Sequence, residues 1–248
     1  MEHLLRATAR AEARHFWFNG FRYFVVPLLR HVTEGQPNLR LLDCGCGTGN
    51  NVALLGQYGR AYGFDLSAVG LRIGREAGRT RLARASVVSA PFPDNTFDVV
   101  TSFDVLYSLQ TADERKAVAE MYRVTRPGGV VLVNVAATES LRGNHSVLSR
   151  EVRRYSRSSL SSLLTGAGFT VERLTYTNAV LFPAMYLGRL LQRTRGLASE
   201  ENADEEIRVP SAPVNLALTA ALRVESWWIR AFDSPFGSSL LCLARKPA

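Results

Sequence analysis

The sequence has few cysteines, few lysines and no long uncharged hydrophobic run, and each shortage excludes a class of protein. Its 248 residues include three cysteines, at positions 44, 46 and 242. Two of them are separated by a single residue, so a disulfide framework is excluded and we expect a cytoplasmic location. The longest charge-free apolar-rich stretches, residues 174–188 and 209–222, are shorter than the ~18–20 residues that a membrane-spanning helix needs. We therefore expect no membrane span.

The charge is unbalanced toward arginine. Only two of the 30 basic residues are lysines, and 22 residues are acidic, which gives a formal net charge of +8. The arginines occur singly or in pairs such as Arg153 and Arg154, not in runs of five or six. This spacing favours a solvated basic surface and no nucleic-acid partner, while a basic face toward anionic substrates or a membrane surface stays open.

Hydrophobic patterning predicts one α/β domain without internal repeats. The 46% hydrophobic content excludes general disorder. Apolar strands are predicted at 39–44, 61–65, 82–88, 97–103 and 130–136, with helices at 50–58, 67–76 and 112–124 between them. Strands that alternate with helices predict a parallel sheet covered on both faces.

The two ends of the chain differ from this alternation. One or two helices are predicted within residues 3–32. After the fifth strand we expect helices at 156–165, 179–193 and 215–232, strands at 170–177 and 238–245, and an exposed acidic loop at 197–209.

A glycine-rich segment carries the chemistry. Asp43, Gly45, Gly47 and Gly49 stand at alternate positions between an apolar strand and a helix. Glycine lets the backbone approach a ligand closely, and the helix start presents unpaired amides. The next strand ends in Asp65, whose carboxylate can accept both hydroxyls of a ribose.

The spacing separates two cofactor classes. A dinucleotide loop reads G-x-G-x-x-G, whereas this one reads G-x-G-x-G with an acid before it. The acid disfavours a pyrophosphate and suits a cationic, amino-bearing ligand, which points to S-adenosylmethionine (SAM) rather than NAD. Cys44 and Cys46 have no second pair and no nearby histidine, so we expect no metal site.

Four segments in register extend this pattern: LLDCGCGTGN (41–50), YGFDLS (62–67), APFPDNTFDVVTSFDVL (90–106) and RVTRPGGVVLVNV (123–135). In these segments the chain closely resembles the class I SAM-dependent methyltransferases of the broad small-molecule group, over residues 39–176. The resemblance implies a Rossmann-like, doubly wound seven-stranded sheet whose last strand, 238–245, is antiparallel. We therefore expect a single domain over 1–248, with an N-terminal helical cap (1–36), a SAM-binding core (37–176), a helical lid or insertion (177–233) and the final strand (234–248).

The resemblance also assigns the cofactor site, with S-adenosylhomocysteine as the product. Asp65 is expected to hold the ribose and Leu66 to pack on the adenine. The other implied contacts are Asp43, Gly45, Cys46, Gly47 and Gly49 at the methionine end, Ser86 and Val87 at the adenine edge, and Ser102 and Phe103 near the methionine amine and sulfonium. Ser86 stands where many relatives have an acid, and Tyr107-Ser108 where many have Glu-His.

The acceptor end has three candidate catalytic residues. His145 is the first choice as general base, because it follows the fifth strand and a subset of bacterial relatives has a similar histidine before Arg-Arg-Tyr. His15 and Tyr107 are the others. Expected substrate contacts are Trp17, Arg154, Tyr155 and Tyr186. In the structural alternative His145 is a surface residue, and Arg154 and Tyr155 fix the start of the next helix.

The predicted function is SAM-dependent methyl transfer to a small, lipophilic or natural-product-like acceptor. A nucleic-acid methyltransferase, a cyclase or isomerase on the same fold, and a SAM-binding regulatory subunit are the alternatives. Residues 177–233 could form a lid over the acceptor, a second core layer, a dimer interface or a peripheral membrane contact. The chain could thus be a monomer or a homodimer.

Overall fold

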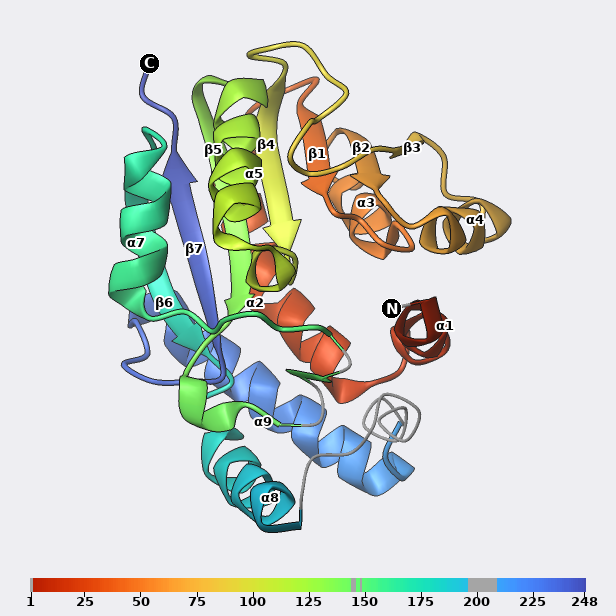
Figure 1. Cartoon of the computed structure of the whole chain (residues 1–248), viewed down its shortest axis with the longest axis vertical. Coiled ribbons are helices and arrows are strands. Elements are labelled where there is room, and N and C mark those ends of the chain that lie inside the picture. The colour runs from red at the N-terminus through yellow and green to blue at the C-terminus, as the bar shows by residue number, and fades with distance from the viewer. Residues whose placement is uncertain (1, 144–145, 148, 196–208) are drawn as a thin grey trace.

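The fold is built on a seven-stranded sheet in the order β3-β2-β1-β4-β5-β7-β6 (Figure 1). The computed structural model describes residues 2–143, 146–147, 149–195 and 209–248. The strands are β1 Arg40–Cys44, β2 Arg60–Asp65, β3 Leu82–Arg84, β4 Phe97–Phe103, β5 Thr125–Ala136, β6 Thr170–Thr177 and β7 Ser239–Arg245. β1 to β5 are parallel, and β7 runs antiparallel to β5 and β6. The predicted α/β sheet with an antiparallel last strand is confirmed.

Helices cover both faces of the sheet. The helices are α1 Glu2–Ala11, α2 Phe16–Thr33, α3 Asn50–Leu55, α4 Ala68–Glu76, α5 Thr111–Val124, α7 Arg157–Gly166, α8 Phe182–Arg195 and α9 Ala212–Ala231, with short 3-10 turns η1 Leu106–Ser108 and η2 Glu139–Leu141. Successive side chains of a strand point to opposite faces. Leu42 therefore belongs to the core cluster that includes residues of α5 and α7, whereas Leu41 belongs to the cluster that includes residues of α2, α3 and α9. Burial on both faces explains the nearly continuous hydrophobic runs of the central strands.

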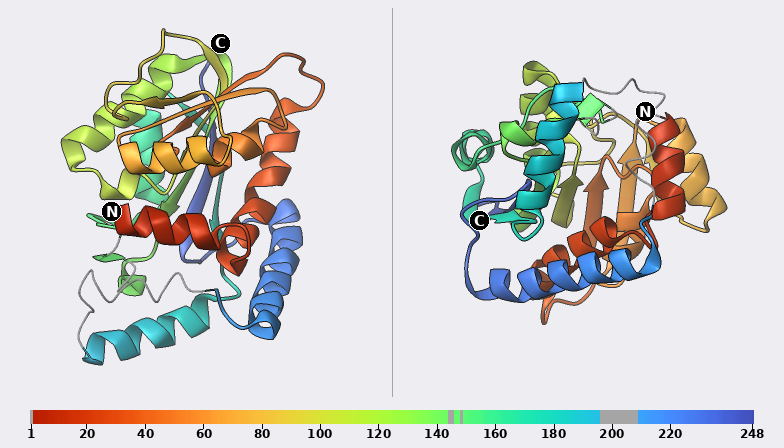
Figure 2. Two further views of the ribbon diagram at one scale, coloured as in Figure 1. Left: turned by 90° about the vertical axis from the view of Figure 1, so that its right-hand side faces the viewer. Right: turned by 90° about the horizontal axis from the view of Figure 1, so that it is seen from below.

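The N-terminal segment has two different roles. Phe24, Val25, Leu28 and Leu29 of α2 belong to the hydrophobic core beneath the sheet. α2 packs closely on α9 at Gly20. A Cβ on this glycine would lie only 2.2 Å from Leu222 Cδ1. α1 instead lies beside the carboxyl ends of the parallel strands, where a cap would lie (Figure 2).

Some element boundaries differ from the predicted ones. The strand predicted at 82–88 ends at Arg84, because the chain turns at 86–89 and Ser89 N donates to Ser86 O at 3.0 Å. The strand predicted at 130–136 begins earlier, at Thr125, which pairs with Phe97 before a register shift. The predicted loop at 197–209 lies outside the described residues except for Val209.

The region between β6 and β7 supplies both core and exposed apolar surface. Leu222 and Ile229 of α9 are buried in the core, so part of this region forms a helical layer that covers the sheet. On the outer side of α9, Trp227 and Trp228 are 56% and 60% exposed. α8 packs against η2 and exposes Leu187 and Leu190. None of the helices in the described ranges is long and apolar enough to cross a membrane.

Candidate cofactor and acceptor site

The glycine loop after β1 needs glycine for two reasons. Gly45, Gly47 and Gly49 have φ values of +80°, +53° and +77°, in the left-handed region. The loop is fixed at its start because Gly45 N and Cys46 N both donate to Phe64 O, at 2.9 and 3.0 Å. A Cβ on Gly45 would also lie 2.4 Å from Val105 Cγ2. Any side chain at this position would push the loop away from the residues that follow β4.

Gly45→Ala is expected to destabilise the protein by about 1–3 kcal/mol more than Gly78→Ala. Both glycines have a positive φ, but a Cβ on Gly78 would meet no atom within 4 Å. The control therefore carries the backbone strain without the clash. Urea unfolding of both variants measures the difference, and equal losses of stability would show that Val105 gives way without cost.

Asp43 is a buried carboxylate of which one oxygen is hydrogen-bonded by the protein. Its Oδ1 accepts from Thr101 Oγ1 at 2.7 Å. Its Oδ2 is buried and has no hydrogen-bond partner in the part of the chain that the structure describes. Burial raises the pKa of Asp43 to about 7; the Thr101 hydrogen bond opposes this rise and the negative charge of Asp65 adds to it. A positively charged ligand nearby would satisfy the carboxylate and favour its ionised form.

Asp43→Asn should change how stability depends on pH. Because the folded-state pKa lies above the unfolded value near 3.8, the contribution of Asp43 to the stability is greatest at low pH and is lost as pH rises toward 7. The introduced amide would keep the Thr101 hydrogen bond and remove this titration. Urea unfolding of the ligand-free proteins at pH 4 and pH 7.5 is the measurement. The stability advantage of the variant should grow with pH, and parallel pH profiles would mean that Asp43 titrates normally.

Asp65 connects the end of β2 to the glycine loop. Its Oδ2 accepts from Gly47 N at 2.8 Å and its Oδ1 from Ser67 N at 2.7 Å. The residue stays partly accessible, so each oxygen keeps a lone pair for a further donor. Leu66 beside it is 65% exposed and offers an apolar surface for a flat ring. In the turn after β3, Val87 packs on the core, and Ser86 Oγ accepts from Val88 N at 3.4 Å.

These residues fit SAM. The glycine loop, Asp43 and Asp65 gather at the carboxyl ends of adjacent strands, as cofactor sites in such sheets do. The two residues predicted near the sulfonium close the neighbouring strand β4: Ser102 is buried, and the ring of Phe103 packs edge-on against Phe21 at 4.9 Å. The Cys44 and Cys46 thiols are buried, and burial raises the pKa of both, so they stay protonated.

A polar cluster that the sequence analysis missed ties the N-terminal segment to the glycine loop. Glu12 follows α1, and its Oε1 pairs with Arg79 Nη2 at 3.0 Å. Its Oε2 accepts from Thr48 Oγ1 at 3.3 Å, and Arg79 Nη1 donates to Thr48 O at 2.8 Å. Single residues far apart in sequence carry no spacing signal, so this contact could not be predicted.

The three predicted catalytic residues have different surroundings. His145 lies outside the described residues. His15 is buried at the start of α2, where its Nδ1 accepts from Trp17 N at 3.1 Å and burial lowers its pKa. This hydrogen bond occupies the lone pair on Nδ1, with which a neutral histidine would accept a proton as a general base. Tyr107 is buried, and burial raises the pKa of its hydroxyl well above the usual value.

The predicted substrate contacts lie on different elements of the fold. Arg154 and Glu151 form an ion pair at 2.9 Å whose side chains are 7% and 1% exposed, and Arg154 Nη1 also donates to Ala137 O. The Tyr155 hydroxyl donates to Glu114 of α5. These contacts favour the structural alternative for both residues. Trp17 is half-buried on α2, whereas Tyr186 is exposed on α8 and stacks on Phe182.

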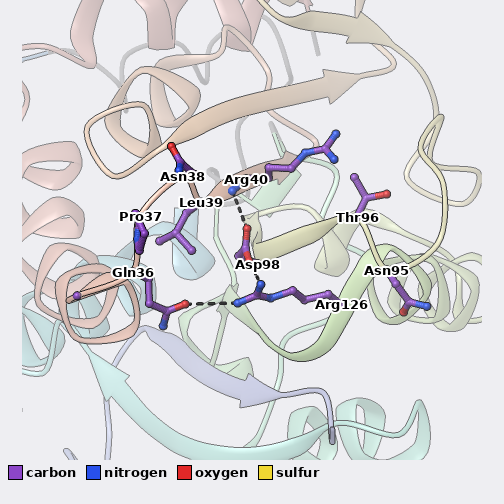
Figure 3. Close-up of a pocket in the computed structure, with 10 residues that line it drawn as sticks. Gln36, Pro37, Asn38, Leu39, Arg40, Asn95, Thr96, Asp98 and Arg126 are labelled. Atoms are coloured by element: carbon purple, nitrogen blue, oxygen red, sulfur yellow. Dashed lines mark hydrogen bonds and ion pairs between the residues drawn. The ribbon is translucent and has the colours of Figure 1, made fainter.

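A hollow of about 500 Å³ lies at the opposite end of the sheet (Figure 3). It is lined by residues at the amino ends of β1 and β4. Asp98 there pairs with Arg126 at 2.7 Å and accepts from Arg40 N, also at 2.7 Å. Since these groups satisfy one another and lie at the edge remote from the glycine loop, the hollow is not part of the cofactor site.

A second functional candidate escaped the sequence analysis. Asp104 directly follows β4, has a φ of +61° and is exposed. Asn134 of β5 fixes it, because Asp104 N donates to Asn134 O at 2.9 Å and Asn134 Nδ2 donates to Asp104 Oδ1 at 3.0 Å. An acid immediately after a central parallel strand was the available signal.

Comparison with known proteins gives the family. A model of the "Methyltransferase domain" family matches residues 42–133. A demethylmenaquinone methyltransferase of Geobacillus sp. (strain WCH70) is 30% identical over 191 residues, which cover 62% of this chain and 80% of the relative. The chain belongs to the class I SAM-dependent methyltransferases. It is thus an enzyme family with SAM as cofactor.

Other relatives and solved structures show how far the similarity extends along the chain. The ubiquinone/menaquinone biosynthesis C-methyltransferase UbiE of Shewanella halifaxensis is 30% identical over 133 residues, covering 49% of this chain and 50% of the relative. The chain therefore spans only about half the length of some curated relatives that it matches. A putative methyltransferase from Bacillus halodurans shares the fold with a TM-score of 0.59, 18% identity and coverage of 90% and 99% of the two chains. The [4+2]-cyclase SpnF shares it too, with a TM-score of 0.57, 22% identity and coverage of 90% and 80%.

Proposed function

We propose that this methyltransferase transfers a methyl group to a small, lipophilic acceptor that carries a ring hydroxyl, such as a hydroquinone. The proposal that the chain uses SAM rests on one observation, which is the buried Asp43 carboxylate with its unpartnered Oδ2 beside a loop that only glycine can form. The proposed acceptor class is supported by the relatives named for demethylmenaquinone and for ubiquinone/menaquinone biosynthesis.

The chain's own residues would divide the work. Asp65 would hold the ribose, Leu66 would pack on the adenine, and the Asp43 carboxylate would face the positive end of the cofactor. Bound SAM supplies a methyl group on a positively charged sulfur, and the C–S electron pair leaves with that sulfur. The protein's remaining task is to hold the acceptor in line and to exclude water, because most of the barrier reduction comes from positioning.

α8, which exposes Leu187 and Leu190, lies close to a segment that follows β5. α8 packs on η2, which follows β5, and a Cβ on Gly143 would lie 2.4 Å from Arg189 Cδ of α8. In Figure 2, α1 and α8 lie on either side of the carboxyl ends of the strands. We propose that these two helices form the walls around the acceptor, with α9 as a core layer behind them.

The acceptor class can be tested with radiolabelled SAM. We expect label in 1,4-naphthohydroquinone or a prenylated derivative, with release of S-adenosylhomocysteine, and no label in DNA or RNA oligonucleotides. Labelled nucleic acid would replace the proposal with a nucleic-acid methyltransferase. SAM binding without transfer to any acceptor would favour the non-methylating alternative, for which the cyclase with the same fold is a precedent.

A further inference from the structure

Four groups that can carry charge or donate a proton lie together after β4 and β5: Asp104, Tyr107, Glu151 and Arg154. The charges of Glu151 and Arg154 both act on Asp104, and the charge of Asp104 acts on Tyr107. Three of the four are committed inside the protein. Glu151 and Arg154 form their buried ion pair, and the buried Tyr107 hydroxyl holds its proton firmly. Asp104 alone is exposed and can exchange a proton with a ligand.

Asp104 also lies next to the cofactor loop. Thr101, three residues earlier on the same strand, pairs with Asp43 in the sheet and donates to its carboxylate. Val105, the next residue, is the one that a Cβ on Gly45 would strike. Asp104 thus stands between the residue that holds Asp43 and the residue that contacts the glycine loop.

The backbone conformation holds the carboxylate in a defined orientation. A φ of +61° is costly for a residue other than glycine, although aspartate and asparagine tolerate it best. Asn134 compensates by bonding both the amide and Oδ1 of Asp104, at 2.9 and 3.0 Å. No side chain in the described ranges hydrogen-bonds Oδ2. One oxygen is therefore fixed and the other is available.

We infer that Asp104 is the general base of the acceptor side, and that its Oδ2 takes the proton from the acceptor's hydroxyl. This inference rests on the proposed function, because it requires an acceptor that carries an acidic hydrogen. The O–H bond breaks, its proton moves to Oδ2, and its electron pair stays on the acceptor oxygen, which then bonds the methyl carbon while the C–S electron pair leaves with the sulfur. Where a ring carbon takes the methyl group instead, the hydrogen on that carbon leaves afterwards as a proton to water, which restores the aromatic ring. The carboxylate becomes a neutral acid, and a later exchange with water restores it.

The surroundings tune Asp104 for this task. Partial desolvation and the charge of Glu151 raise the pKa of Asp104, while the Asn134 hydrogen bond and the charge of Arg154 lower it, and the net effect is a rise. Because the residue is exposed to water, solvent screening limits this rise. A base with a pKa close to the working pH is the most effective one.

The matched variants are Asp104→Asn and Asp113→Asn. Asparagine tolerates the left-handed φ and can still accept from Asn134 Nδ2, so the first variant removes the base and keeps the backbone. Asp113 is a half-buried carboxylate on α5, 3.8 Å from Lys116, and its variant makes the same change of charge. We expect single-turnover methyl transfer to 1,4-naphthohydroquinone to fall by ~10²–10⁴-fold in Asp104→Asn, with unchanged affinity for S-adenosylhomocysteine. Asp113→Asn should keep the wild-type rate.

A second readout does not depend on turnover. The side-chain amide of Asn134 donates to Asp104, so its NMR signals should titrate in the ligand-free wild type with a midpoint clearly above pH 5, and should not titrate in Asp104→Asn. The wild-type rate should rise with pH over the same range. A midpoint near pH 4, or a normal rate in Asp104→Asn, overturns the inference. Two outcomes separate this inference from the proposed function. If the wild type methylates no acceptor although the Asn134 signals titrate as expected, the proposed function fails, and the assignment of Asp104 as the base for its acceptor fails with it. If the enzyme is active but the midpoint lies near pH 4, only the assignment of Asp104 is rejected.

Discussion

Replacing Arg154 by methionine is expected to lower the free energy of unfolding by about 3–5 kcal/mol. The guanidinium bonds both oxygens of Glu151, at 2.9 and 3.0 Å, and also Ala137 O at 3.0 Å. Glu151 is 1% exposed at its side chain, so the variant would leave a buried carboxylate without its cation. Urea or thermal unfolding measures the loss.

Two further variants separate the buried charge from lost packing. Arg72→Met breaks an exposed pair, in which Arg72 lies 3.9 Å from Glu76 and the side chains are 59% and 69% exposed, so it should cost less than about 1 kcal/mol. In Arg154→Met with Glu151→Gln, much of the lost stability should return because no unpaired charge remains. If Arg154→Met is as mild as the surface control, the ion pair does not hold the segment between β5 and α7.

Asp65→Ala is expected to weaken SAM binding by about 2–3 kcal/mol, or roughly 30- to 150-fold. The variant removes the acceptor for the ribose hydroxyls and also frees Gly47 N, which Asp65 holds at 2.8 Å. Calorimetric titration with S-adenosylhomocysteine, on protein shown to be folded, gives the change in affinity.

Ser67→Ala is the matched control for Asp65→Ala. Ser67 caps α4 through Gly70 N at 3.1 Å, and its own amide still reaches Asp65 in the variant. It should lose stability through the lost cap but keep its affinity for the cofactor. An unchanged dissociation constant in folded Asp65→Ala would place the ribose elsewhere.

The sheet and the cofactor loop could be predicted because their signals are local. The run from Leu41 to Asp43 and the alternating glycines fix a strand, a tight loop and a helix start within ten residues. The start of the helix predicted at 67–76 is local in the same way, and in the structure Ser67 caps α4 by accepting from Gly70 N. The start of the strand predicted at 130–136 could not be placed in this way, because the long-range pairing of Thr125 with Phe97 extends β5 back across Pro127 and Gly128.

The acceptor side could not be predicted to the same depth. Arg154 and Tyr155 resemble a substrate motif in sequence, yet Glu151 and Glu114 occupy their polar groups in the fold. The position of Asp104 after β4 could be read from the sequence, but the hydrogen bond from Asn134 that fixes its carboxylate could not. Long-range partners decide whether a polar residue serves the fold or remains available to a ligand, and one sequence does not contain them.

The central claim is that the glycine loop, Asp43 and Asp65 form a SAM site. Isothermal titration calorimetry of the full chain with SAM, S-adenosylhomocysteine and NAD tests it most directly. The account predicts one site per chain for SAM and for S-adenosylhomocysteine and no heat of binding with NAD, because the acid before the loop repels a pyrophosphate. Binding of NAD together with no detectable binding of SAM would contradict it.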